Sequence, residues 1–156
     1  MSASAVELVA PAEAVFVVIG QPVPQGSKQA FVVKGRAGVT ERGRAALGPW
    51  RSQVAAAAAE AIAVPMVGAL AVALLFHLPR PKAHYRGGAH AGELREDAPV
   101  YVSTRPDVDK LARAVLDALT GVAFRDDGQV AELTCSKLFA ERAGVVVTIR
   151  ALVPFE

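Results

Sequence analysis

Strand-like segments lie at both ends of the chain, and this placement restricts its possible folds more than any other feature. Short apolar runs bounded by turn residues predict strands, whereas apolar residues at helical spacing predict helices. The predicted strands are at 14–19, 30–33, 67–78, 130–138 and 145–152, and the predicted helices are at 41–63 and 106–119. This order favours an α+β fold with a small mixed or antiparallel sheet and two main helices.

The connections between these elements are uneven in length. Residues 20–28 (GQPVPQGSK) predict a loop, residues 34–40 (KGRAGVT) a turn, and residues 141–144 (ERAG) a hairpin that joins the last two strands. Residues 79–104 form a much longer segment, rich in Pro, Gly and His, with a short strand expected at 100–102. Loops of this length are usually functional or disordered.

The length of 156 residues suits one domain with its own core. We expect an Ala-rich flexible tail at 1–13 and a single domain at 14–156. A content of 53% hydrophobic and 21% charged residues excludes a disordered chain. The single cysteine, Cys135, excludes an intrachain disulfide and is consistent with a reducing compartment.

The most apolar stretch, residues 61–76, does not predict a membrane span. It is interrupted by Pro65 and Gly68 and is shorter than the ~20 residues that a spanning helix needs. The first residues also lack the basic region of a signal peptide. We therefore expect a cytoplasmic protein with no membrane partner.

Charge is distributed unevenly along the chain. Residues 28–86 contain nine Lys and Arg against two acids, whereas residues 93–132 contain nine acids against five bases. A basic half beside an acidic cluster suits a protein that holds a polyanion and places a cation next to it. Ordinary variation of surface charge is an equally good explanation at this point.

The acidic cluster begins at the start of the second predicted helix. Pro106 favours a helix start, because its missing N–H would have no partner there. Asp107 and Asp109 then fall where the helix dipole favours acids and where a carboxylate can cap free N–H groups. Capping alone would explain these two residues.

A second acidic pair, Asp126 and Asp127, favours a functional explanation. Asp109, Arg113 and Asp117 are also spaced four residues apart, which places them in one polar stripe on the helix. Clustered carboxylates repel one another unless a cation neutralises them, and Mg²⁺ prefers oxygen ligands. Such a site lowers the pKa of a bound water and neutralises charge on a phosphate that is under attack.

The segment 106–130 (PDVDKLARAVLDALTGVAFRDDGQV) resembles the signature of the RusA family of Holliday junction resolvases, which is frequent in phages and prophages. That signature is similar to P-D-x-D-N-x-x-K-x-x-x-D-A-L, a short spacer and D-D-x-Q. Weaker similarity extends over 14–152 and includes the loop at 20–28. The matching residues are Asp107, Asp109, Asp117, Ala118, Leu119, Asp126, Asp127 and Gln129.

The resemblance implies a homodimer that resolves four-way DNA junctions by paired symmetric nicks in recombination and repair, in the cytoplasm of a bacterial or phage-infected cell. It implies Mg²⁺ as the cofactor, with Mn²⁺ as a substitute, and no small-molecule cofactor. Asp107, Asp109 and Asp127 match the essential carboxylates, with Asp126 beside them as a further metal ligand. Arg113 stands where the family has a catalytic Lys.

Two positions depart from the family pattern. Lys110 stands where the family has Asn, and Arg113 stands where the family has Lys. Arginine keeps the positive charge of lysine but has a different shape. Arg113 is therefore either a phosphate contact or the partner of Asp109 and Asp117 in a structural ion pair.

Basic residues within and outside the signature are candidates for contacts with DNA phosphates, which supply most of the affinity of DNA-binding proteins. For each of them alone, a solvated surface charge is the better explanation, whereas as a group they suit a groove that holds DNA. Lys137 is expected to share a strand face with Cys135 and Phe139, close to the carboxylates. The predicted DNA-contacting residues are Lys28, Lys34, Arg36, Arg80, Lys82, Lys110 and Lys137.

Other residues favour structural roles. His84 and His90 lack further ligands at zinc-binding spacing, Cys135 is expected in the core, and Trp50 in the core or a dimer interface.

Three other functions remain as alternatives. A nuclease for flaps or replication forks would use the same carboxylates. A non-catalytic DNA-binding or packaging protein gains nothing from acids that face phosphate. A glycosyltransferase with a DxD motif would need a longer chain and a doubly wound sheet.

Overall fold

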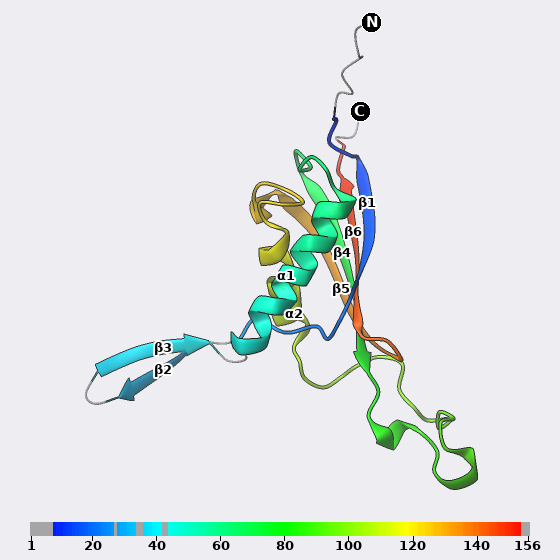
Figure 1. Cartoon of the computed structure of the whole chain (residues 1–156). Helices are drawn as coiled ribbons and strands as arrows, with labels where there is room; N and C mark the ends of the chain where they lie inside the picture. The colour runs from blue at the N-terminus through cyan, green and yellow to red at the C-terminus, as the bar shows by residue number, and fades with distance from the viewer. Residues whose placement is uncertain (1–7, 27, 34–35, 42–43, 154–156) are drawn as a thin grey trace, which may run out of the picture.

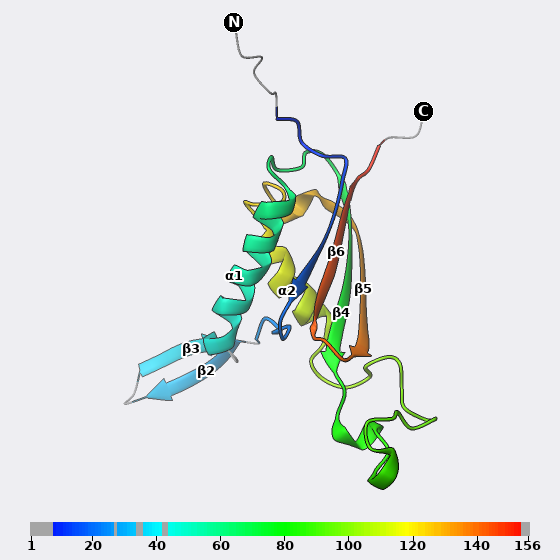
Figure 2. The ribbon, with the colours of Figure 1, turned by 45° about the vertical axis from the view of Figure 1, so that its right-hand side comes forward.

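The computed structural model describes residues 8–26, 28–33, 36–41 and 44–153, and for 28–33, 36–41 and Arg44 it describes the backbone alone. Four strands form one sheet, and two helices cover one of its faces (Figures 1 and 2). The predicted α+β fold with a mixed sheet and two main helices is confirmed. The strands are β1 (Glu13–Ile19), β4 (Leu70–Pro79), β5 (Val130–Ala140) and β6 (Gly144–Ala151), and the helices are α1 (Arg44–Ala61) and α2 (Val108–Leu119).

The strand order in the sheet is β1-β6-β4-β5. β6 is antiparallel to both β1 and β4, whereas β5 is parallel to β4. The predicted hairpin between the last two strands is therefore wrong. The apolar strand β4 lies between them and bonds to both, so residues 141–143 cross its end. The parallel pair β4–β5 needs a crossover connection, and α2 provides it.

A second prediction also fails, because residues 36–41 form a strand and not a turn. β3 (Arg36–Glu41) pairs antiparallel with β2 (Lys28–Val33), and Arg36 is opposite Val33. Val39 and Thr40 are β-branched, which suits a strand. This two-stranded hairpin projects away from the main sheet (Figure 1).

The core lies between the sheet and the two helices. Alternate residues of β1 and β6 face the helices, and Trp50 of α1 is 2% exposed, which places it in the core. Burying a side chain of this size stabilises the fold by roughly 1.5–3 kcal/mol. Other fully buried side chains are Val54, Met66, Leu70, Val72, Phe76, Leu111, Val115, Leu119, Phe124, Val145 and Ile149.

The long segment between β4 and α2 contains only two 3₁₀ turns, Lys82–His84 and Gly88–His90. The strand predicted at 100–102 is reduced to a single bridge between Tyr101 and Leu138. Val102 N–H donates to the carbonyl of Lys137 at 3.0 Å, and Phe139 N–H donates to the carbonyl of Val100 at 3.0 Å. Residues 100–102 therefore run beside β5 before the chain reaches the start of α2.

Within the described part of the chain, no helix is long and apolar enough to cross a membrane. The predicted tail at 1–13 falls largely on residues 1–7, which lie outside the described residues, and β1 begins at Glu13.

Candidate active site

α2 begins at Val108, so Asp107 is its N-cap residue. The side chain of Asp107 makes no capping hydrogen bond, although its carbonyl accepts from Leu111 N–H at 3.1 Å. The carboxylate instead lies 3.5 Å from the ammonium of Lys110, and both side chains are partly exposed. Helix capping therefore does not account for the carboxylate of Asp107.

The predicted polar stripe on α2 faces an open pocket of about 400 Å³. Asp109, Arg113 and Asp117 line it from the helix, and Asp127 lines it from the turn before β5. The apolar part of the wall consists of Val108, Ala112, Leu116, Leu133 and Cys135.

Arg113 forms no ion pair with any carboxylate among the described residues. The structural ion pair with Asp109 and Asp117, one of its two possible roles, is not formed. The guanidinium of Arg113 is exposed at the pocket and remains available to an anion.

Asp126 and Asp127 are presented by a tight turn. Asp126 Oδ1 accepts from Gly128 N–H at 2.9 Å, and Gln129 Oε1 accepts from the N–H groups of Arg125 at 3.0 Å and Asp126 at 3.1 Å. This reciprocal arrangement is a capping box. Gln129 Nε2 also donates to the carbonyls of Met66 at 3.1 Å and Gly68 at 3.0 Å. Gln129 therefore ties the acidic turn to the segment before β4.

This role of Gln129 was missed in the sequence, although the spacing D-x-x-Q at 126–129 is a recognisable capping signal. The contacts of its amide nitrogen with residues more than sixty positions earlier have no local signature.

Replacement of Gln129 by Glu tests whether this side chain holds the acidic turn to the segment before β4. The carboxylate would lose both donated bonds and face two carbonyl oxygens, so we expect unfolding free energy to fall by about 2 kcal/mol. Urea unfolding at pH 8 measures the change. Gln53→Glu is the matched control, because Gln53 is exposed on α1, and it should change stability by less than about 0.5 kcal/mol. Equal stability of the two variants would contradict the proposed tie.

The two adjacent carboxyl groups titrate differently. The backbone N–H of Gly128 and a hydrogen bond from Asp127 lower the pKa of Asp126. That same hydrogen bond to Asp126, some burial, and the charges of Asp126 and Asp117 raise the pKa of Asp127. Protonation of Asp127 supplies a donor to Asp126 and removes repulsion between the two carboxylates, so the pKa of Asp127 lies above that of Asp126.

The opposite pKa shifts of Asp126 and Asp127 predict two separate titration midpoints in the metal-free protein. Because the fold favours the protonated form of Asp127, its carboxyl should titrate at a higher pH than that of Asp126. In Asp126→Asn the neighbouring charge is removed while the amide oxygen still accepts from Gly128, so the pKa of Asp127 should fall. Carbon-detected NMR titration of the carboxyl groups measures both values. An unchanged Asp127 midpoint in the variant would contradict the influence of Asp126 on Asp127.

The structure thus assembles part of the predicted carboxylate set. Asp109 and Asp127 line one pocket and Asp117 joins them, whereas Asp107 lies beside Lys110 and is not among the lining residues. Among the described residues, no three His, Cys, Asp or Glu side chains are close enough together to hold a metal ion. The oxygen ligands themselves are of the type that Mg²⁺ prefers.

Three predicted DNA-contacting residues also make contacts inside the protein, and one of them is Lys110, which is paired with Asp107. The ammonium of Lys137 donates to the carbonyls of Thr104 at 2.7 Å and Pro106 at 2.8 Å. Arg80 donates to the carbonyl of Pro99 at 2.6 Å. Contacts of these residues with DNA remain predictions.

The remaining candidates are spread over the molecule. Lys28 is in β2 and Arg36 in β3, whose side chains are not described, and Lys34 lies outside the described residues. Cys135 is half-buried in the pocket wall, and this burial raises the pKa of its thiol. The thiol is therefore protonated at neutral pH, in agreement with a packing role.

The comparison with known proteins places every residue that lines the pocket within one family match. The family model described as endodeoxyribonuclease RusA matches residues 20–150, which include every residue that lines it. The uncharacterized protein YqaN of Bacillus subtilis (strain 168) is 28% identical over 136 residues, covering 86% of this chain and 94% of the relative. The chain therefore belongs to the RusA family of endodeoxyribonucleases.

Proposed function

We propose that this nuclease resolves four-way DNA junctions by paired symmetric nicks that depend on Mg²⁺, and that it acts in recombination and repair. The observation that carries the proposal is the open pocket that Asp109, Asp117 and Asp127 line together with Arg113, which has no ion pair among the described residues. A pocket with this combination suits a cation and a phosphate together.

Asp107, Asp109 and Asp127 are the proposed metal ligands, with Asp126 beside them. Mg²⁺ takes few carboxylates and keeps several waters, so an open acidic pocket fits its needs, and Mn²⁺ would substitute. The bound ion would supply a water of lowered pKa and positive charge next to the scissile phosphate.

Arg113 is the proposed phosphate contact. Its guanidinium lies on the same helical face as Asp109, one turn further along α2. Two parallel N–H groups can bond to two phosphate oxygens, which fixes the phosphate in position and offsets the charge that develops during attack. Arginine at this position thereby serves the role of the family's lysine with two-point contact.

A homodimer would present two such sites to one junction, as paired nicking requires. Val15, Val17 and Ile19 of β1 are each more than half exposed on the sheet face away from the helices, which supports an interface there. Sedimentation at micromolar concentration measures the state, and a monomeric wild-type protein would contradict the dimer.

The test of the function uses labelled DNA of different shapes at equal salt. We expect symmetric paired nicks in a four-way junction with Mg²⁺ or Mn²⁺, and binding without cleavage in Ca²⁺. Faster cleavage of flaps or forks would instead favour a general nuclease for branched DNA. Failure to cleave any branched DNA would favour a non-catalytic DNA-binding protein.

A further inference from the structure

Residues 80–99, here called the arm, extend beyond the end of β4 (Figures 1 and 2). The arm is attached to the sheet through Phe139 of β5. The ring of His84 meets the ring of Phe139 edge to face at 4.8 Å, and the guanidinium of Arg80 lies 5.3 Å from that ring. Edge-to-face contacts and a cation near an aromatic ring both stabilise such a junction. The base of the arm is therefore held in place.

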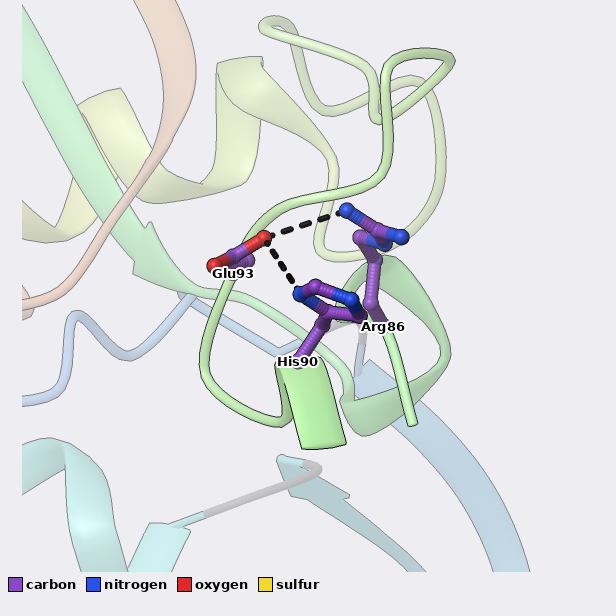
Figure 3. Close-up of polar contacts among 3 residues, drawn as sticks. All are labelled: Arg86, His90 and Glu93. Carbon is purple, nitrogen blue, oxygen red and sulfur yellow. Dashed lines mark hydrogen bonds and ion pairs between the residues drawn. The ribbon is translucent and has the colours of Figure 1, made fainter. Parts of the chain in front are cut away.

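The outer part of the arm is also folded. Tyr85 and Leu94 form an antiparallel bridge, Arg86 N–H donates to the carbonyl of Glu93 at 2.7 Å, and Arg95 N–H donates to the carbonyl of His84 at 2.9 Å. Figure 3 shows the side chains of Arg86 and His90 directed at one carboxylate oxygen of Glu93, at 3.1 and 3.6 Å. These contacts hold the two sides of the arm together, and they pair the carboxylate of Glu93 with Arg86 and His90.

This folding leaves a pocket of about 590 Å³ within the arm. Its volume is in the range of sites that hold small organic ligands. Alanine and glycine provide the space, Tyr85 provides an aromatic ring, and three cations provide charge, with no carboxylate among the described lining residues. The lining residues are Lys82, Ala83, Tyr85, Arg86, Gly87, Ala91, Gly92 and Arg95.

The charges of the pocket are not equivalent. Arg86 is paired with Glu93, whereas neither Lys82 nor Arg95 has a carboxylate partner in the described part of the chain. A ligand with an anionic group and a planar apolar group would satisfy both the free cations and the ring of Tyr85. A nucleotide from an unpaired DNA strand has both groups, and single-strand binding sites combine cations with aromatic rings in this way.

We propose that the arm pocket holds one unpaired nucleotide at the branch point of the substrate, with its base against Tyr85 and its phosphate at Lys82 and Arg95. Paired bases are stacked within a duplex and cannot enter, so the pocket would favour branched over regular DNA. The chain from Pro99 to Asp107 spans at most about 28 Å. This linker limits the distance between the base of the arm and the start of α2. The proposal rests on the proposed nuclease function for its substrate.

The first experiment uses the full chain with single-stranded oligothymidine, measured by fluorescence anisotropy in Ca²⁺. Tyr85→Leu should weaken binding about tenfold, because stacking on an aromatic ring contributes that much per base. Tyr101→Leu is the matched control, since Tyr101 is 66% exposed and does not line the pocket. Equal affinity of the two variants would overturn the proposal.

A charge variant covers the case in which Tyr85→Leu folds poorly. Lys82→Gln with Arg95→Gln should make the salt dependence of oligothymidine binding shallower by about 0.7 in log–log slope, since the one phosphate held by these two cations contributes about 0.7. Arg51→Gln with Arg142→Gln is the charge-matched control. Equal slopes in the two double variants would also overturn the proposal.

A four-way junction with 2-aminopurine at the branch point connects the pocket to the substrate. Binding of the wild-type protein in Ca²⁺ should change the 2-aminopurine fluorescence, and Tyr85→Leu should abolish the change. No change with the wild-type protein would overturn the branch-point assignment. If the wild-type protein nicks junctions but Tyr85 has no effect, only the arm proposal fails. If Tyr85 matters for oligothymidine but no branched DNA is cleaved, only the proposed nuclease function fails.

Discussion

Replacement of Asp109 by Asn is expected to lower the rate of junction nicking about a thousandfold while leaving junction binding in Ca²⁺ intact. Asparagine has nearly the same shape as aspartate but carries no charge, so the pocket keeps its packing and loses a proposed metal ligand. A bound ion contributes several kcal/mol of charge stabilisation, and about 4 kcal/mol corresponds to three orders of magnitude in rate. Single-turnover nicking of a labelled four-way junction measures the loss.

The matched control for this prediction is Asp97→Asn. Asp97 is exposed in the arm and lines none of the pockets described above, so its replacement should leave nicking within about twofold of wild type. Near-normal nicking by Asp109→Asn would remove Asp109 from the metal site. Loss of junction binding together with nicking would show instead that Asp109 supports the structure of the pocket.

The helical part of the candidate site was predictable because its geometry is local. Residues four positions apart on a helix share a face. Asp109, Arg113 and Asp117 therefore had to lie together once α2 was recognised, and the structure places all three in one pocket. A different local pattern, a short apolar run bounded by turn residues, predicted the strands β1 and β4.

Strand pairing could not be predicted in the same way, because it joins residues far apart in the sequence. The pattern of β5 and β6 shows which residues are apolar and does not show which strand each one meets. The short connection at 141–144 predicted a hairpin, yet both strands pair with β4. The closeness of β5 and β6 in the sequence therefore did not predict their pairing, because the apolar strand β4 has two edges and pairs with one of them at each edge.

The roles of single polar side chains were equally hidden. A lysine or arginine in a sequence has the same charge whether its donors face solvent or a backbone carbonyl. Arg80 is bonded to Pro99, and Gln129 binds Met66 and Gly68, each through a partner distant in sequence. Only the folded chain shows that these groups hold together segments that are distant in the sequence.

Lys137 is the residue for which a DNA contact and a structural role can be told apart most directly, because the two roles predict different kinetics. Its ammonium bonds to the carbonyls of Thr104 and Pro106, which immediately precede Asp107. Lys137→Met keeps the aliphatic stem and removes both bonds. We expect unfolding free energy to fall by about 2 kcal/mol, since each bond to a charged group contributes about 1.5–3 kcal/mol when buried and less when exposed.

The same variant should lower kcat for junction nicking about a hundredfold at saturating DNA and raise the Mg²⁺ concentration needed for half-maximal rate. A shift of about 1 Å in a catalytic group is enough for a loss of this size. Lys137→Arg should restore part of the rate, because a guanidinium can also donate to two carbonyls. Arg142→Met, in the exposed turn between β5 and β6, is the control and should change neither quantity. If Lys137→Met instead weakens junction binding and leaves kcat and the Mg²⁺ requirement unchanged, Lys137 contacts DNA and does not position Asp107.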